Sequence, residues 1–342
     1  MVLLAAYRIG KDALPDYAHR FSPKKFTQPQ LFACLVLKAF WKTDYRGVCC
    51  GLEDLPDLRT AIGLRRVPHF TTLQKTAGRL LLAASAQALL ESSIGRLMPQ
   101  RKVPLAAVDS TGLEGHYVSS YFVRRRAKTP GKWQETTYRR YPKLGAVCDC
   151  RTHAILSTMT ARGPTPDVHQ MQRVVLPAAR RVRIARLLAD AGYDSEANHV
   201  RMREGLGIET IIPAKHGRPT SKLPTTTYRR LMAVAFDNDA YGQRWQIETV
   251  FSMIKRNLGE HLSARTYWGQ CREMVLLALT HNVMILWRRL RAFLQSKPVP
   301  FCPIKSAGLG RRAALGWRVV GLAVWPRLRR LAAGALRAGA IA

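Results

Sequence analysis

The chain has few acidic residues for its length. It contains 342 residues, with 22 Asp and Glu against 55 Lys and Arg, which gives a formal net charge of +33. A compact protein with this excess repels itself unless a polyanion is bound, so an ordinary metabolic enzyme is not the first expectation. Nucleic acid is the usual polyanion, and an anionic membrane surface is the second.

The sequence also lacks the patterns of a disulfide framework, a four-cysteine zinc site and a membrane span. Its cysteines are odd in number and include no C-x-x-C pair. The longest apolar run, Met274–Trp287, is interrupted by Thr280, His281 and Asn282 and is shorter than the roughly 20 residues that cross a bilayer. We therefore expect a cytoplasmic protein with reduced thiols and no membrane partner. His281 and Asn282 are expected to make buried polar contacts rather than to bind metal.

Residues 1–100 are predicted to be helical. Apolar residues recur at helical spacing over 73–97, and Thr71 or Thr72 is the expected N-cap of that helix. A short helix over 58–64 precedes it and ends at a glycine-containing turn. This arrangement resembles a helix-turn-helix, and two core helices joined by a loop are an equally good interpretation.

Short β-prone runs alternate with helical segments from residue 101 to 295, which predicts an α/β domain with a mixed sheet flanked by helices. One run ends at Asp109 and a later run ends at Asp190. Ligands collect at the carboxyl ends of strands in such sheets, so we expect these two carboxylates to lie close together. Their mutual repulsion requires a cation, and Mg²⁺ prefers carboxylate and phosphate oxygens. Asp194, in the following loop, is a rival for the second acid.

A long helix is predicted over residues 238–258. At 100° per residue, Tyr241, Arg244, Glu248 and Lys255 fall within roughly 60° of one helix face. A neighbouring apolar stripe is expected to pack this helix on the sheet. Glu248 is then a metal ligand, and Arg244 and Lys255 contact phosphate. A surface ion pair between Arg244 and Glu248 is the alternative interpretation.

A basic stretch with interspersed aromatic residues lies between the first two predicted strands. Cations in such a segment bind phosphates, and exposed aromatic rings stack on frayed bases. A solvated β-hairpin with aromatic anchors in the core is the alternative. The cations are Arg124, Arg125, Arg126, Lys128, Lys132, Arg139, Arg140 and Lys143.

The last segment, residues 296–342, is predicted to be a basic, weakly ordered extension, since no Asp or Glu follows Glu273. It is interpreted as a DNA-binding extension or as translated sequence beyond a degraded end. A third interpretation is a membrane-surface contact through Trp317 to Leu336.

The ordered acids and their neighbours resemble a known family. The set Asp109-Ser110-Thr111, Asp190-Ala191-Gly192-Tyr193-Asp194 and Y-x2-R-x3-E-x6-K is similar to bacterial insertion-sequence transposases of the DDE class, in particular to the group of insertion sequences 4 and 5. The resemblance implies a ribonuclease H-like catalytic domain, which we place over 101–295. The helical domain over 1–100, with its arrangement similar to a helix-turn-helix, is the candidate for binding DNA ends. The resemblance implies two divalent ions, Mg²⁺ or Mn²⁺, held by Asp109, Asp190 and Glu248, with Tyr241, Arg244 and Lys255 as signature residues.

The resemblance also implies an activity. Such an enzyme binds the terminal inverted repeats of its element in the nucleoid, and cuts and transfers DNA strands as a homodimer in the synaptic complex. Its partners are double-stranded transposon ends and target DNA. Our hypothesis is that Asp109 bridges both ions, while Asp190 completes one and Glu248 the other. The alternatives are a catalytically silent DNA-binding protein derived from a transposase, and a general basic nuclease of the same fold.

Overall fold

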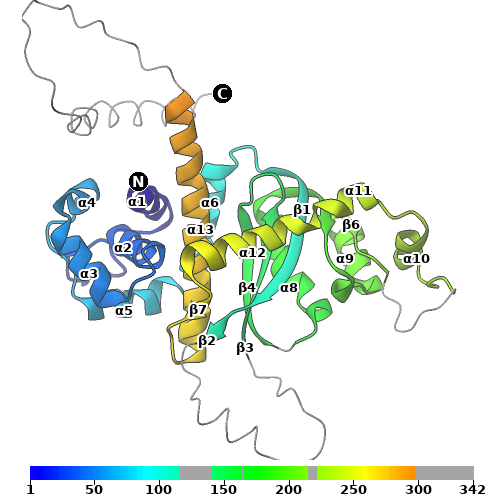
Figure 1. Ribbon diagram of the computed structural model, residues 1–342, viewed down its shortest axis with the longest axis horizontal. Coiled ribbons are helices and arrows are strands. Elements are labelled where there is room, and N and C mark those ends of the chain that lie inside the picture. The colour runs from blue at the N-terminus through cyan, green and yellow to red at the C-terminus, as the bar shows by residue number, and fades with distance from the viewer. Residues whose placement is uncertain (116–140, 164, 215–221, 297–342) are drawn as a thin grey trace, which may run out of the picture. The chain divides into compact units, whose positions relative to one another are not determined.

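The computed structural model describes residues 1–115, 141–163, 165–214 and 222–296, and all of these fall within one compact unit (Figure 1). A five-stranded mixed sheet forms its centre, in the order β4-β3-β1-β5-β6. The first three strands in this order are antiparallel, and β1, β5 and β6 are parallel. The predicted α/β fold with a mixed sheet is therefore confirmed. The strands are β1 (Lys102–Gly112), β3 (Tyr141–Asp149), β4 (Ile155–Gly163), β5 (Arg183–Leu188) and β6 (Glu209–Ile211).

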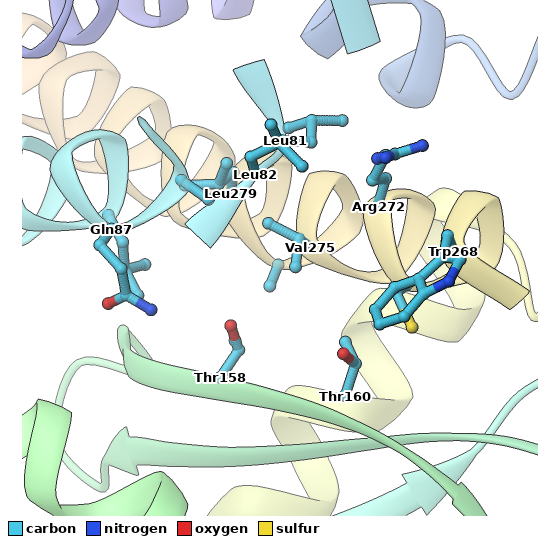
Figure 2. Close-up of a pocket in the computed structure, with 13 residues that line it drawn as sticks. Leu81, Leu82, Gln87, Thr158, Thr160, Trp268, Arg272, Val275 and Leu279 are labelled. Carbon is cyan, nitrogen blue, oxygen red and sulfur yellow. The ribbon is translucent and has the colours of Figure 1, made fainter. Parts of the chain in front are cut away.

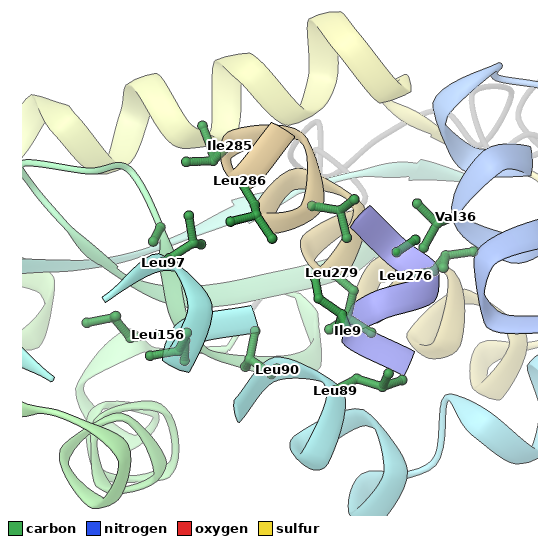
Figure 3. Packing of buried hydrophobic residues seen from close by; sticks show 14 of the residues in the cluster. Ile9, Val36, Leu89, Leu90, Leu97, Leu156, Leu276, Leu279, Ile285 and Leu286 are labelled. Carbon is green, nitrogen blue, oxygen red and sulfur yellow. The ribbon is translucent and has the colours of Figure 1, made fainter. Parts of the chain in front are cut away.

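Helices cover both faces of the sheet. The apolar stripe of α12 packs against the sheet residues Ala107, Leu144 and Leu188, as the sequence predicts. A second core gathers the N-terminal helices, α13 and the opposite sheet face, and Figure 3 shows Leu279 and Ile285 of α13 among its members. The remaining elements after β4 are α8 (Met171–Arg181), α9 (Glu196–Leu206), α10 (Thr227–Val234), α11 (Asn238–Tyr241), α12 (Trp245–Leu258) and α13 (Tyr267–Ser296), with the short strands β2 (Glu114–Gly115) and β7 (His261–Leu262) paired beside them.

The first hundred residues form helices, as predicted, and their core is continuous with one face of the sheet. A capping box starts α2, because Thr27 Oγ1 accepts from Gln30 N at 3.3 Å and Gln30 Oε1 accepts from Thr27 N at 2.9 Å. A separate domain over 1–100 stays a prediction, as does its role at DNA ends. The helices are α1 (Val2–Ala13), α2 (Gln28–Phe40), α3 (Tyr45–Asp54), α4 (Pro56–Ala61), α5 (Phe70–Leu80) and α6 (Ala83–Leu97).

The prediction of one helix over 73–97 was wrong. The chain breaks between α5 and α6, and the side chain that caps α5 is His69, not Thr71 or Thr72. The break has a packing cause. Leu73 and Leu80 of α5 are buried beside α2, whereas Leu89 of α6 packs with α1 and α13, and one straight helix cannot direct both sets into the core.

The predicted buried roles of His281 and Asn282 are confirmed. Both lie on α13, where Asn282 is fully buried and His281 is 2% exposed. The Nε2 atom of His281 lies 2.8 Å from the carbonyl oxygen of His153, so the neutral ring donates a hydrogen bond there. Among the described helices, α13 included, none is long and apolar enough to cross a membrane.

We expect His281 to make the protein less stable as the pH falls from 6.5 towards 4. Burial lowers the pKa of His281 to about 4, and the unfolded chain therefore binds a proton first. The contribution of the neutral ring to the free energy of unfolding is fully present above pH 6.5. It has fallen by up to about 3 kcal/mol at pH 4. Urea unfolding of the parent and of His281→Gln at several pH values measures it; parallel pH profiles would contradict this prediction.

Candidate active site

Asp109 lies inside β1 rather than at its end, which corrects the sequence interpretation. On one side β1 pairs with β3 as far as Gly112, and Asp109 is opposite Ala146. On the other side the parallel partner β5 ends at Leu188, which is opposite Ala107. The strand is therefore longer than its apolar run because its antiparallel neighbour continues. Asp109 still lies beyond the parallel part of the sheet, where a carboxylate is accessible.

Asp190 follows β5 at the same level. Since Ala107 and Leu188 are register partners, Asp109 and Asp190 each stand two residues beyond the last parallel pair. The carboxylate of Asp190 is held by Gly192 N, which donates to Oδ1 at 2.8 Å. A Cβ atom at Gly192 would lie 2.9 Å from this oxygen, so a larger residue there would displace the carboxylate.

The electrostatics of Asp109 agree with a cluster of acids. Burial, with a smaller contribution from the negative charges of Asp190 and Asp167, raises the pKa of Asp109 to about 6. The Ser110 N–H, which donates to Asp109 Oδ1 at 2.7 Å, and the Arg244 guanidinium act in the opposite direction. Burial and the neighbouring carboxylates thus both disfavour an uncompensated charge on Asp109, which a proton or a metal cation would relieve.

The third acid is carried by a helical segment with a break in it. Gly242–Arg244 forms a 3₁₀ turn between α11 and α12, so the predicted continuous helix over 238–258 was wrong in this part. Tyr241 and Arg244 precede α12, and Glu248 lies in its first turn. Lys255 is in the last turn of α12, about 10 Å along the axis from Glu248 at 1.5 Å per residue.

Arg244 connects the acids. Its Nη1 lies 3.7 Å from Asp109 Oδ2, and its Nη2 donates to Glu248 Oε1 at 2.7 Å. The guanidinium carbon is 5.9 Å from the centre of the Tyr241 ring. The structure therefore places Arg244 between Asp109 and Glu248, with the Tyr241 ring near its guanidinium, and the ion pair that was the alternative interpretation of Arg244 and Glu248 is present.

Hard oxygen donors make a divalent cation suitable for Asp109 and Asp190. No group of three His, Cys, Asp or Glu side chains that could hold a metal occurs among the residues the structure describes. Glu248, whose side chain is 54% exposed, is turned towards Arg244 instead. Asp109 and Asp190 thus supply oxygen donors that fit a divalent metal, and Glu248 would join them only after leaving Arg244.

A neighbouring network was missed by sequence reasoning. Asp167 Oδ1 accepts from Ser110 Oγ at 2.9 Å and pairs with Lys143 Nζ at 2.7 Å. Lys143 is buried in β3 and also donates to the carbonyl of Thr165 at 3.0 Å, so it does not belong to the exposed basic stretch with which it was grouped. Asp167 stands in a short 3₁₀ helix (Asp167–His169), and nothing in the local sequence distinguishes it from a solvated acid.

We expect Lys143→Met to destabilise the fold by about 2–3 kcal/mol. The substitution leaves the Asp167 carboxylate beside Asp109 without its cation, and removing one partner of a buried pair is costly. Chemical denaturation measures the loss. The double variant Lys143→Met, Asp167→Leu is expected to recover part of it; no recovery would show that the pair does not carry the effect.

Asp194, the rival of Asp190, has a different environment. Its carboxylate is fully buried, with Arg229 Nε at 2.9 Å and His199 Nε2 at 3.5 Å. The backbone N–H groups of Tyr228 and Arg229 donate to Glu196 nearby, so these acids hold α10 against α9. Asp194 is therefore a structural residue.

The basic residues Arg124, Arg125, Arg126, Lys132, Arg139 and Arg140 lie outside the described residues, as does the segment 297–342. An apolar cavity of about 250 Å³ lies between α6, β4 and α13, and Figure 2 shows Leu82, Val275 and Trp268 around it. Its described lining contains no carboxylate, so the cavity is no alternative to the acid cluster as the active site.

Comparison with known families decides the assignment. The family described as "Transposase DDE domain" matches residues 101–283, which is more than half of the chain and includes all three acids. The chain belongs to the transposase DDE domain family. No match is found among curated protein sequences.

Solved transposase structures are remotely similar to this DDE-family chain. A piggyBac transposase synaptic complex with hairpin DNA is 12% identical, with 87% of this chain and 73% of that chain covered and a TM-score of 0.40. The Mos1 mariner paired end complex with Mn is also 12% identical, with 85% of each chain covered and a TM-score of 0.22.

Proposed function

We propose that the protein is a DNA transposase of the insertion sequence 4 and 5 type with a ribonuclease H-like catalytic domain. In this proposal it binds the terminal inverted repeats of its element in the nucleoid and performs cut-and-paste strand cleavage and transfer as a homodimer. One observation supports this proposal: Asp109 and Asp190 stand at the same level just beyond the parallel part of the sheet, and Arg244 links Asp109 to Glu248.

Asp109, Asp190 and Glu248 hold the two divalent ions in this proposal, with Mg²⁺ or Mn²⁺ as the metal. When bound, the pair of ions supplies an activated oxygen nucleophile and stabilises the leaving oxygen of the phosphodiester. Glu248 would leave Arg244 to hold a metal, and the guanidinium of Arg244, which donates to Glu248 in the structure, would then be available to contact a phosphate oxygen. Lys255 neutralises a second phosphate along the same helix, and Ser110 with Asp167 keeps Asp109 in position.

The experiment is metal-dependent nicking of a labelled duplex that carries the inverted repeat flanking the gene. Cleavage at the repeat boundary in Mg²⁺, and none in EDTA, supports a transposase. Cleavage at many positions regardless of sequence would indicate a general nuclease.

One observation favours a second candidate function. The ion pair between Arg244 and Glu248 keeps the third acid away from the aspartates. A catalytically silent DNA-binding protein would keep this pair with DNA bound. Specific repeat binding without nicking in Mg²⁺ or Mn²⁺ would establish this alternative.

A further inference from the structure

A basic depression lies at the end of the sheet opposite to the acids. It has a volume of about 550 Å³ and is formed by the start of β1, the start of β5 and the ends of α8 and α9. Lys102 begins β1 and is seven residues from Asp109, so the depression is about 23 Å from the acids at ~3.3 Å per residue. Its cations are Arg101, Lys102, Arg180, Arg181 and Arg183.

Two of these cations serve the fold. Arg101 and Arg181 both pair with Glu91 of α6, and they also donate to backbone carbonyls: Arg101 to that of Arg181, and Arg181 to those of Leu156 and Pro177. One carboxylate therefore balances half of their charge, and the hydrogen bonds keep both guanidinium groups in place. Both side chains line the depression.

The other three cations have no such partner. Lys102, Arg180 and Arg183 are exposed, and no carboxylate within the part of the chain that the structure describes forms an ion pair with them. Lys102 and Arg183 are direct register partners on adjacent strands, a position where like charges repel and destabilise the sheet. An anion between them would remove this repulsion.

Helix dipoles explain only part of this charge. Arg180 lies in the last turn of α8, where a cation interacts favourably with the partial negative charge of about half a unit at the helix end. α9 also ends at the depression, and together the two helix ends offset about one charge. Lys102 and Arg183 are on strands and have no comparable reason to be basic. A net excess of about two to three positive charges remains at the depression.

We propose that this depression binds the phosphodiester backbone of double-stranded DNA, as a second contact on the opposite end of the sheet from the cleavage site. The spacing of phosphates favours DNA over a single small anion. A duplex presents one charge per about 1.7 Å of axis, so each of three separate cations can contact its own phosphate. The choice of DNA rests on the proposed function, whereas the requirement for a polyanion rests on the charges alone.

The test compares two triple variants that lose the same charge. Lys102→Gln, Arg180→Gln, Arg183→Gln alters the depression, and Arg151→Gln, Arg201→Gln, Arg230→Gln removes three exposed cations elsewhere. The slope of log affinity against log salt for a random duplex is expected to fall by up to about 2.7 for the first variant, at ~0.9 per phosphate contact. Equal changes in both variants would overturn the proposal.

A second readout locates the contact directly. Amine acylation of Lys102 in the parent is expected to slow when a duplex is added. Duplex RNA and inorganic phosphate are the comparison ligands: protection by either one, without protection by DNA, would refute DNA as the occupant. Both readouts use binding only, so they stand or fail independently of whether the protein cleaves transposon ends.

Discussion

Asp109→Asn is expected to lower strand cleavage by about three orders of magnitude, because the metal-held carboxylate contributes several kcal/mol of transition-state stabilisation at 1.36 kcal/mol per tenfold. The Asp109 carboxylate interacts electrostatically with Asp190, Asp167 and Arg244. The asparagine keeps the shape and the hydrogen-bonding oxygen for Ser110 N but removes the charge that binds a cation. Gel assays of nicked and transferred products in Mg²⁺ measure the effect.

The matched control for this variant is Asp239→Asn. Asp239 is an exposed acid on α11, just before Tyr241, and is expected to leave cleavage unchanged. Binding of the repeat, measured by mobility shift without metal, is expected to stay the same or become tighter in Asp109→Asn. Full cleavage activity in Asp109→Asn, or equal losses in the two variants, would remove Asp109 from the active site.

Asn282→Ala is expected to cost about 3–5 kcal/mol of the free energy of unfolding. The Asn282 side chain accepts from Ile155 N at 2.8 Å and donates to Ile155 O at 2.9 Å and to Ser93 Oγ at 3.1 Å. The amide thus satisfies both backbone groups of Ile155 at the start of β4, as a neighbouring strand would. Truncation leaves several buried polar groups without partners, at ~1–3 kcal/mol each, and opens a cavity. Urea denaturation monitored by circular dichroism measures this loss.

Thr280→Val provides the comparison on the same helix. The Thr280 hydroxyl is also buried in α13 but has no hydrogen-bond partner among the described residues. Valine matches its shape, so the variant is expected to be neutral or more stable by about 1 kcal/mol, since an unsatisfied buried hydroxyl is removed. A loss for Thr280→Val as large as that for Asn282→Ala would show that the helix tolerates no change there, whatever the hydrogen bonds.

The sequence predicts the acids better than it predicts their surroundings. Asp190 follows an apolar strand, and Tyr241, Arg244 and Glu248 remain neighbours across a 3₁₀ turn, because one turn shifts side chains by only part of the helix circumference. The role of Lys255 stays a prediction. The local sequence pattern is sufficient to predict where these residues lie. It was not sufficient to predict that β1 continues past Asp109, since that depends on pairing with β3.

Long-range contacts account for what was missed. Lys143 reaches Asp167 only because β3 and β4 form a hairpin that brings residues 24 positions apart in the sequence into an ion pair. The break between α5 and α6 depends on which helices bury Leu80 and Leu89. Neither relation leaves a periodic signal in the sequence, and the basic depression likewise appears only when β1 and β5 are placed in register.

A structure of the protein with Mn²⁺ and a cleaved transposon end is the most direct test of the acid cluster. We expect one ion to be bound by both Asp109 and Asp190, and Glu248 to have left Arg244 for a second ion. Metal bound without Asp109, or an ion pair between Arg244 and Glu248 that persists beside bound DNA and metal, would contradict the proposed active site.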